Sequence, residues 1–248
     1  MMTPRRGQAW AAIAGAFLAL CALAPFLPAA SFDPPLISAA KNGQMANILS
    51  DLAQGQNPNV VDSHGYTPAM WAISRGSQPM LQALLSHGAA LPAATAGYIP
   101  LIEAAKNGKT DVAQFLLAHG AAVNAQDALG NTALMWAVGN GNADTAAALI
   151  QGGADVNAAN HLGQSALIKA AQLGETDLVN LLVAQRANLN AQDGFGYTAL
   201  MWAAHDGNAD AAKALLGAGA DPAVKGRDGL TAQAIARIRG YPGLAQIL

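Results

Sequence analysis

Six glycines recur at a nearly fixed interval, and this spacing constrains the fold more than any other feature of the chain. They are Gly65, Gly97, Gly130, Gly163, Gly196 and Gly229, and successive members lie 32, 33, 33, 33 and 33 residues apart. A period of about 20 to 50 residues is typical of architectures that stack one small structural unit many times. We therefore expect a repeat protein rather than a domain with one central core.

The residues around each glycine predict two helices per repeat. A threonine or serine, as in Thr67–Ala72 and Thr198–Ala203, precedes a run of good helix formers and can cap the helix, and proline is tolerated in the first turn. A second glycine follows eleven residues after the first and ends this helix. Apolar stripes in Asp111–Ala118 and Asp177–Ala184 predict a second helix after a tight turn.

The period, the helix starts, the paired leucines and the turn Gly153–Ala158 together resemble ankyrin repeats. The resemblance extends from about Phe32 to Leu248 and implies an all-α repeat solenoid. It implies about seven helix-turn-helix repeats joined by short β-hairpin loops, with the first helices lining a concave surface. The expected domain, residues 31–248, divides into repeats near 32–61, 62–93, 94–126, 127–159, 160–192, 193–225 and 226–248.

The chain departs from the family pattern at several places. Where the family often has a histidine in the first helix, this chain has Met70, Ile102, Met135, Ile168 and Met201, so we expect apolar packing there. Arg186 replaces a turn glycine, and Leu91–Ala93 replaces the usual turn sequence, so we expect irregular geometry at these two joints.

The first thirty residues predict an export signal. Arg5 and Arg6 precede an uncharged, mainly apolar stretch that ends in Ala29 and Ala30, which is the layout of a secretory signal peptide. The apolar run is close to the roughly 20 residues that span a bilayer, so an uncleaved membrane anchor is the alternative. The protein is thus expected to be periplasmic or secreted, or else anchored in the inner membrane and facing the periplasm.

Charge and cysteine content exclude several partners and sites. The chain has 13 Lys and Arg against 15 Asp and Glu, and loss of the leader would remove two arginines, so we expect no nucleic-acid partner. Cys21 is the only cysteine and lies in the leader, which leaves no thiol for a disulfide or a metal site in the repeat domain.

No pattern in the repeats predicts catalysis. Gly194–Ala199 fits a dinucleotide-binding fingerprint, but that motif must follow a strand of a βαβ unit and here it lies between repeats. The five histidines show no metal-ligand spacing. Asp62, Asp127 and Asp193 begin three of the hairpins, where their side chains can accept backbone N–H bonds. We therefore expect no catalytic, cofactor-binding or metal-binding residues, and no enzyme.

The resemblance also implies where a partner binds, because ankyrin repeats commonly use the hairpin and the end of the first helix. The corresponding residues are His64, Tyr66, Arg75, Tyr98, Lys106, Asn107, Leu129, Asn131, Asn140, His161, Leu162, Gln172, Phe195, Tyr197, His205 and Asp206. Aromatic residues in this set favour an interface. For the three tyrosines the alternative is packing against the neighbouring hairpin.

One position of the first helix alternates between tryptophan and charge. Its residues in five consecutive repeats are Trp71, Glu103, Trp136, Lys169 and Trp202. They lie three and four residues before the predicted contact positions, hence on the same helical face. Either they line the binding groove, or the tryptophans fill space between repeats.

These features predict an exported protein–protein interaction scaffold, acting as a monomer, that binds a protein partner through the hairpin tips and the first helices. Two alternatives remain at this point. One is an accessory or maturation factor that stabilises an exported enzyme, and the other is a membrane-anchored interaction module. The same fold serves many partners, so specificity depends on a few surface residues.

Overall fold

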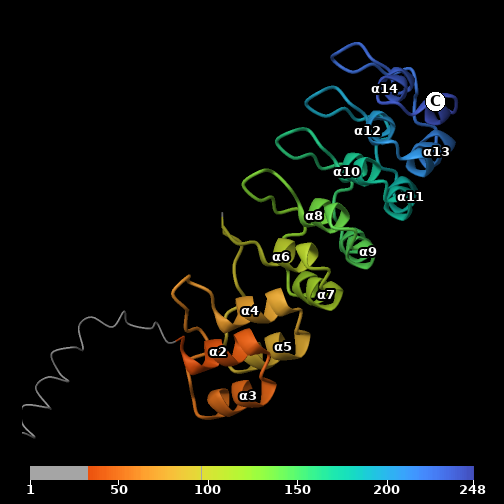
Figure 1. The fold of residues 1–248 in the computed structure, drawn as a ribbon. Coiled ribbons are helices and arrows are strands. Elements are labelled where there is room, and N and C mark those ends of the chain that lie inside the picture. The colour runs from red at the N-terminus through yellow and green to blue at the C-terminus, as the bar shows by residue number, and fades with distance from the viewer. Residues whose placement is uncertain (1–32, 96) are drawn as a thin grey trace, which may run out of the picture.

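The computed structural model describes residues 33–95 and 97–248, which form seven consecutive pairs of helices (Figure 1). The first helices of the pairs are α2 (Pro35–Asn42), α4 (Pro68–Arg75), α6 (Pro100–Lys106), α8 (Ala133–Gly139), α10 (Ala166–Leu173), α12 (Ala199–Asp206) and α14 (Ala232–Ile238). The second helices are α3 (Met45–Ala53), α5 (Gln78–Ser86), α7 (Thr110–Ala118), α9 (Ala143–Gln151), α11 (Thr176–Ala184), α13 (Ala209–Gly217) and α15 (Pro242–Ala245). The predicted all-α repeat solenoid is confirmed.

Local sequence explains where the first helices begin and end. The side chains of Thr132 and Thr198 accept hydrogen bonds from backbone N–H groups three residues later, at 3.3 Å in both repeats. These bonds satisfy donors that a helix start leaves without partners. Gly174 and Gly207 end α10 and α12 in the left-handed conformation, with φ of 74° and 77°.

The first helices pack together more closely than the second helices do along the stack. Closer packing on one side bends the stack toward that side, so the first helices lie on the inside of the curve. The hairpin loops project from the first-helix layer in a row (Figure 1). We call the surface formed by the loops and the first helices the inner face.

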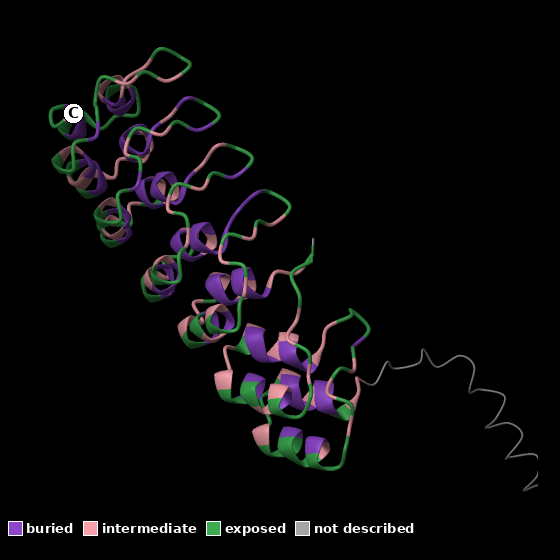
Figure 2. Ribbon diagram, turned by 180° about the vertical axis from the view of Figure 1, so that it is seen from behind, coloured by how far each residue is buried: buried purple, intermediate pink, exposed green. Residues whose placement is uncertain are grey.

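One apolar core runs through the whole stack. Buried residues are concentrated in the first helices, as Figure 2 shows. Ile102, Met135, Ile168 and Met201 are at most 4% exposed, while Met70 is half-buried. Apolar packing therefore occupies the position where the family often has histidine, as expected.

The hairpin loops carry little strand structure. In the part of the chain that the structure describes, they contain isolated antiparallel bridges, such as Gln126 with Thr132 and Ala159 with Ser165, rather than extended strands. Asp127 shapes its loop instead, because its Oδ1 atom accepts hydrogen bonds from the backbone N–H groups of Leu129 and Asn131, both at 2.9 Å.

The expected irregularity at Arg186 is wrong. Arg186 adopts a left-handed backbone with φ of 61°, the same conformation that glycines take at this place in other repeats. Its N–H bonds to the Val183 carbonyl at 2.9 Å, and the N–H of Ala187 bonds to the Leu182 carbonyl at 3.0 Å. The neighbouring structure holds arginine in a conformation that glycine adopts more easily.

The other unusual joint does differ from the rest. Thr95 forms a bridge with Tyr98, and position 96, one of the two positions between them, is not described. The carboxylate that shapes the loop in the next repeat has no counterpart at Ala94 or Thr95.

The predicted signal peptide or anchor, residues 1–30, lies outside the described residues. No helix within 33–95 and 97–248 is long and apolar enough to cross a membrane.

Candidate interaction surface

Three tryptophans of the inner face are tied to the hairpin of their own repeat. The indole Nε1 of Trp71, Trp136 and Trp202 donates to the Oδ2 atom of the aspartate nine residues earlier, at 3.2, 2.8 and 2.7 Å. These partners are Asp62, Asp127 and Asp193. Each aspartate therefore holds the loop with one oxygen and the first helix with the other. We call this arrangement the Asp–Trp clamp.

The repeat between the second and third clamps uses a different pair. Asn160 replaces the aspartate, and Lys169 replaces the tryptophan. The Oδ1 atom of Asn160 still accepts the two loop N–H bonds, at 3.0 Å each, and its Nδ2 donates to Asn131 of the preceding hairpin at 2.9 Å. A second carboxylate oxygen is needed only where an indole donor faces it.

Lysines from the preceding repeat cover two of the three tryptophans. The Nζ atom of Lys41 lies 4.9 Å from the ring centre of Trp71, and that of Lys106 lies 4.2 Å from the ring centre of Trp136. A cation over an indole face is attracted by the ring electrons. The tryptophans are half-buried, so they contribute to packing and still reach the inner face.

Hydrogen bonds and burial change the ionisation of the clamp carboxylates. Burial alone would raise the pKa of Asp62, but the N–H groups of Tyr66 and His64, together with Lys41 and Trp71, hold it well below its ordinary value. The pKa of Asp127 is likewise lowered, because donors that include Trp136 outweigh the effect of burial. Both groups therefore remain ionised acceptors at neutral pH.

The hairpin tips expose a row of large apolar side chains. Leu129, Leu162 and Phe195 occupy the same position in three consecutive repeats and are 64%, 62% and 62% exposed. Backbone bonds join the tips, since the carbonyls of these residues accept from the N–H groups of His161, Gly194 and Arg227, at 3.0, 2.7 and 3.1 Å. The row is thus held rigidly although its side chains lie in solvent.

A family model for ankyrin repeats matches residues 10–95, 36–127, 90–160, 134–226 and 167–248. The chain belongs to the ankyrin-repeat family. No curated protein sequence matches it. Ankyrin repeats are generally protein–protein interaction modules and are typically non-enzymatic scaffolds, which directs attention to the exposed residues of the inner face.

The ankyrin-type contact positions on the loops divide into exposed and packed residues. His64 and His161 are exposed, like the apolar tip row, whereas Asn131 is only 7% exposed and accepts the bond from Asn160. Asn131 therefore serves the hairpin stack. Tyr66, Tyr98 and Tyr197 are half-buried.

The tyrosines pack as the alternative interpretation proposed. The ring centres of Tyr66 and Tyr98, on neighbouring hairpins, lie 5.7 Å apart. Tyr197 lies 5.5 Å from Trp202 and donates its hydroxyl to Asp228 of the next repeat at 2.6 Å, and this bond together with burial raises the pKa of Tyr197 to about 12. The Tyr98 hydroxyl is buried with no hydrogen-bond partner among the described residues.

The contact positions at the end of the first helices also join neighbouring repeats. The side chains of Arg75 and Asn140 donate to the backbone carbonyls of Lys41 and Lys106, at 2.6 and 3.1 Å. Asn107 bonds within its own repeat, to the carboxylate of Glu103 at 3.0 Å.

In the sixth repeat the two contact residues bond to each other. The Nδ1 atom of His205 lies 2.7 Å from the Oδ1 atom of Asp206, and the His205 ring lies 5.2 Å from that of Trp202. Gln172, one repeat earlier, faces a hollow beside Lys169.

Sequence reasoning missed a ladder of asparagines in the turns before the hairpins. The Oδ1 atoms of Asn124, Asn157 and Asn190 accept the backbone N–H of the residue 31 positions later, at 2.8, 2.7 and 2.9 Å. The repeated asparagine before alanine in the turn was the available signal. These bonds fix the spacing between repeats and place the tips in register.

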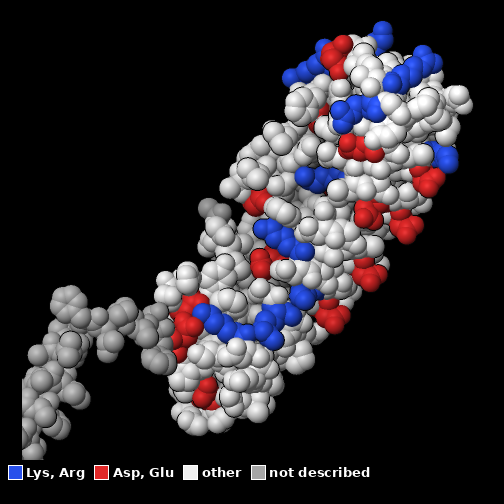
Figure 3. All heavy atoms as spheres, viewed as in Figure 1, with Lys and Arg blue, Asp and Glu red and all other residues white. Residues whose placement is uncertain are grey.

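Charge is distributed unevenly over the faces. In Figure 3, Lys and Arg lie in a line along the visible face and Asp and Glu gather along its right-hand edge. The first helices carry Lys41, Arg75, Lys106 and Lys169, while the first turns of second helices carry Asp111, Asp144, Asp177 and Asp210. Within 33–95 and 97–248, no group of three or more His, Asp or Glu side chains is arranged to hold a metal ion.

Proposed function

We propose that the protein is an exported interaction scaffold that binds a protein partner through the hairpin tips and the inner face. The exposed apolar row at Leu129, Leu162 and Phe195 carries this proposal. Large apolar side chains that lie side by side in solvent mark interaction sites more often than scattered single ones do. Because the tips are joined by backbone bonds, little conformational freedom is lost when a partner covers them.

Affinity capture with matched variants tests the proposal. The purified repeat domain serves as bait in extracts of the producing cell, beside a variant that combines Leu129→Ser, Leu162→Ser and Phe195→Ser. We expect the wild type to retain a partner that the tip variant loses, with an unchanged unfolding temperature. A control variant, Leu49→Ser with Ile247→Ser, removes exposed apolar residues on α3 and at the C-terminus and should retain the partner.

Equal capture by the wild type and the tip variant would exclude the tips as the binding surface. Capture of nothing beyond what an unrelated bait retains would reject the interaction function itself.

Export is the second part of the proposal, and it rests on the order of basic, apolar and small residues in the first thirty positions. We propose a periplasmic or secreted location with loss of roughly the first 29 or 30 residues. Intact mass of the protein recovered from the producing cell measures this directly. A full-length species in the membrane fraction would instead support the anchored alternative.

A further inference from the structure

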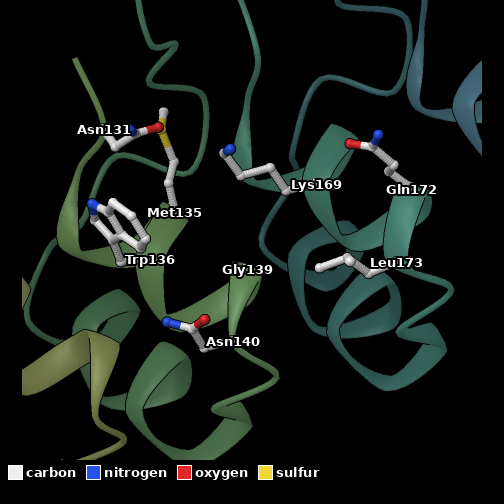
Figure 4. Close-up of a pocket in the computed structure, with 8 residues that line it drawn as sticks. All are labelled: Asn131, Met135, Trp136, Gly139, Asn140, Lys169, Gln172 and Leu173. Carbon is white, nitrogen blue, oxygen red and sulfur yellow. The ribbon is translucent and has the colours of Figure 1, made fainter. Parts of the chain in front are cut away.

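A hollow of about 230 Å³ lies on the inner face between α8 and α10. Met135, Trp136 and Gly139 line it from α8, and Lys169, Gln172 and Leu173 line it from α10, with Asn131 and the α8 cap residue Asn140 also contributing. Figure 4 shows the Lys169 side chain reaching from α10 toward α8, on the side where Trp136 and Asn131 lie.

Lys169 makes no ion pair within 4.0 Å among the described residues. Its Nζ atom donates to the neutral Oε1 atom of Gln164 at 3.4 Å, and no carboxylate of residues 33–95 or 97–248 lies within 4.0 Å of it. The side chain is half-buried, and burial lowers the pKa of Lys169 below its ordinary value, although the charge of the Asp127 carboxylate acts in the opposite direction. An ammonium group that has lost part of its hydration and makes no direct ion pair favours an incoming carboxylate.

Two other charges of the inner face, on Lys41 and Glu103, are satisfied by the chain itself. Lys41 lies 2.7 Å from Asp33 and 3.1 Å from Asp62. Glu103 occupies the same helical position as Lys169, two repeats earlier. Its carboxylate accepts hydrogen bonds from Ser74 at 3.1 Å and Asn107 at 3.0 Å. Lys106 also has no carboxylate within 4.0 Å among the described residues, but its ammonium group lies 4.2 Å from the ring centre of Trp136. Lys169 is the lysine that lines the hollow.

The first repeat shows how a carboxylate fits such a place. There Asp33, from the segment before α2, reaches a lysine whose ammonium group also lies over a tryptophan. In the hollow, the indole of Trp136 and the 53% exposed Leu173 offer apolar walls beside Lys169. A carboxylate carried on one or two methylene groups matches a cation flanked by apolar walls.

We propose that this hollow is a carboxylate site for the partner protein. The side chain of an aspartate or glutamate in an extended, acidic segment of the partner enters between Trp136 and Lys169. Its carboxylate binds the Nζ atom of Lys169, and its methylene groups contact the indole and Leu173. The side-chain amide N–H groups of Gln172, which also lines the hollow, can donate to the second carboxylate oxygen. This inference rests on the proposed interaction function and specifies the chemistry of its partner.

Peptide titration followed by NMR tests the site on the full repeat domain. The probe is a blocked peptide of three Gly-Leu-Glu-Ser units, and its counterpart carries Gln in place of each Glu. We expect the Glu peptide to shift the Trp136 indole N–H and the Lys169 side-chain signals, and to bind about tenfold more tightly than the Gln peptide at low salt. Binding should also raise the measured pKa of Lys169.

Matched variants separate a site from general attraction. Lys169→Met should bring the two peptides to the same affinity, while Lys213→Met, on α13 and beside Asp210, should leave their ratio unchanged. If Lys169→Met does not fold, Lys169→Gln replaces it. Equal affinity of the two peptides for the wild type overturns the proposal, as does an equal effect of both lysine variants.

The two proposals fail in different ways. If the peptides bind equally but the tip variant still loses a captured protein, the carboxylate site is wrong and the interaction function stands. If the Glu peptide is preferred but no protein depends on the tips, the tip surface is wrong while the hollow remains a carboxylate site.

Discussion

Single side chains decide how each hairpin is attached to its helix. Asp127 and Trp136 act as a unit, because the carboxylate supplies a second acceptor and the indole supplies the donor that fills it. In the repeat with Asn160 and Lys169, the helix presents no indole N–H. The single amide oxygen of Asn160 is therefore enough to accept the hydrogen bonds of the loop. The choice between Asp and Asn at this position follows from the residue nine places later.

The lowered pKa of Asp127 predicts loss of stability in acid. Its ordinary value is 3.8 and its folded value is lower, so its contribution to stability is full above pH 4 and is lost as the pH falls through the folded value. Urea unfolding measured from pH 7 to pH 2 should show this decline. Asp127→Asn should lower the free energy of unfolding at pH 7 by about 1–2 kcal/mol and make its decline in acid shallower. A decline of unchanged steepness in the variant would contradict this account.

Arg186 offers a stabilising substitution. A non-glycine residue in the left-handed conformation costs about 1–2 kcal/mol, which exceeds the entropy that glycine adds to the unfolded chain. We expect Arg186→Gly to raise the free energy of unfolding by about 0.5–1 kcal/mol in urea titrations. The reciprocal change Gly153→Arg, at the same turn position with φ of 88° and open space beside it, should lower it by a similar amount. A destabilised Arg186→Gly protein would show that the arginine side chain makes a contact that outweighs its strain.

The hairpins form one continuous element along repeats four to seven because each tip touches the next. A Cβ atom on Gly196 would lie 2.8 Å from the backbone nitrogen of Arg227, and one on Gly163 would lie 3.0 Å from that of Gly194. These glycines thus meet two requirements, a positive φ and close approach of the next loop. The contact is what holds Leu129, Leu162 and Phe195 in a row.

Comparison of two glycines at the same repeat position separates these requirements. Gly196→Ala should lower the free energy of unfolding by about 2–3 kcal/mol, because it adds a backbone clash to the left-handed strain. Gly229→Ala should cost about 1 kcal/mol, since Gly229 has φ of 79° but open space around it. Chemical denaturation of both variants measures the difference. Equal costs would mean that the hairpins separate without penalty.

The whole stack was largely predictable, because its period, helix starts and turn glycines follow from local chemistry that one chain displays many times. The interaction surface was less predictable from the sequence. The exposed tips were predicted from their position, but the burial of Asn131 and the bonds from Arg75 to Lys41 depend on residues of neighbouring repeats about 30 positions away. The tryptophans were placed either in the binding groove or between repeats. In the structure they are half-buried and bonded to the aspartate of their own hairpin, and their part in binding stays a prediction. The error at Arg186 arose because the hydrogen bonds that end α11 hold the backbone in the left-handed conformation, against the local preference of arginine.

Removal of the last repeat tests whether stability is distributed as nearest-neighbour contacts. Deleting residues 226–248 removes the bond from Tyr197 to Asp228 and that from Arg239 to the His205 carbonyl, and it uncovers one side of α12. In a stack, each repeat is stabilised mainly by its neighbours, so this loss should stay local. Hydrogen exchange should show faster exchange in α12 and α13 and unchanged protection in α4 to α9. The full-length Tyr197→Phe protein, which lacks only the Asp228 bond, should exchange like the wild type outside the last hairpin. Uniform loss of protection in the truncated protein would mean instead that all the repeats unfold as one unit.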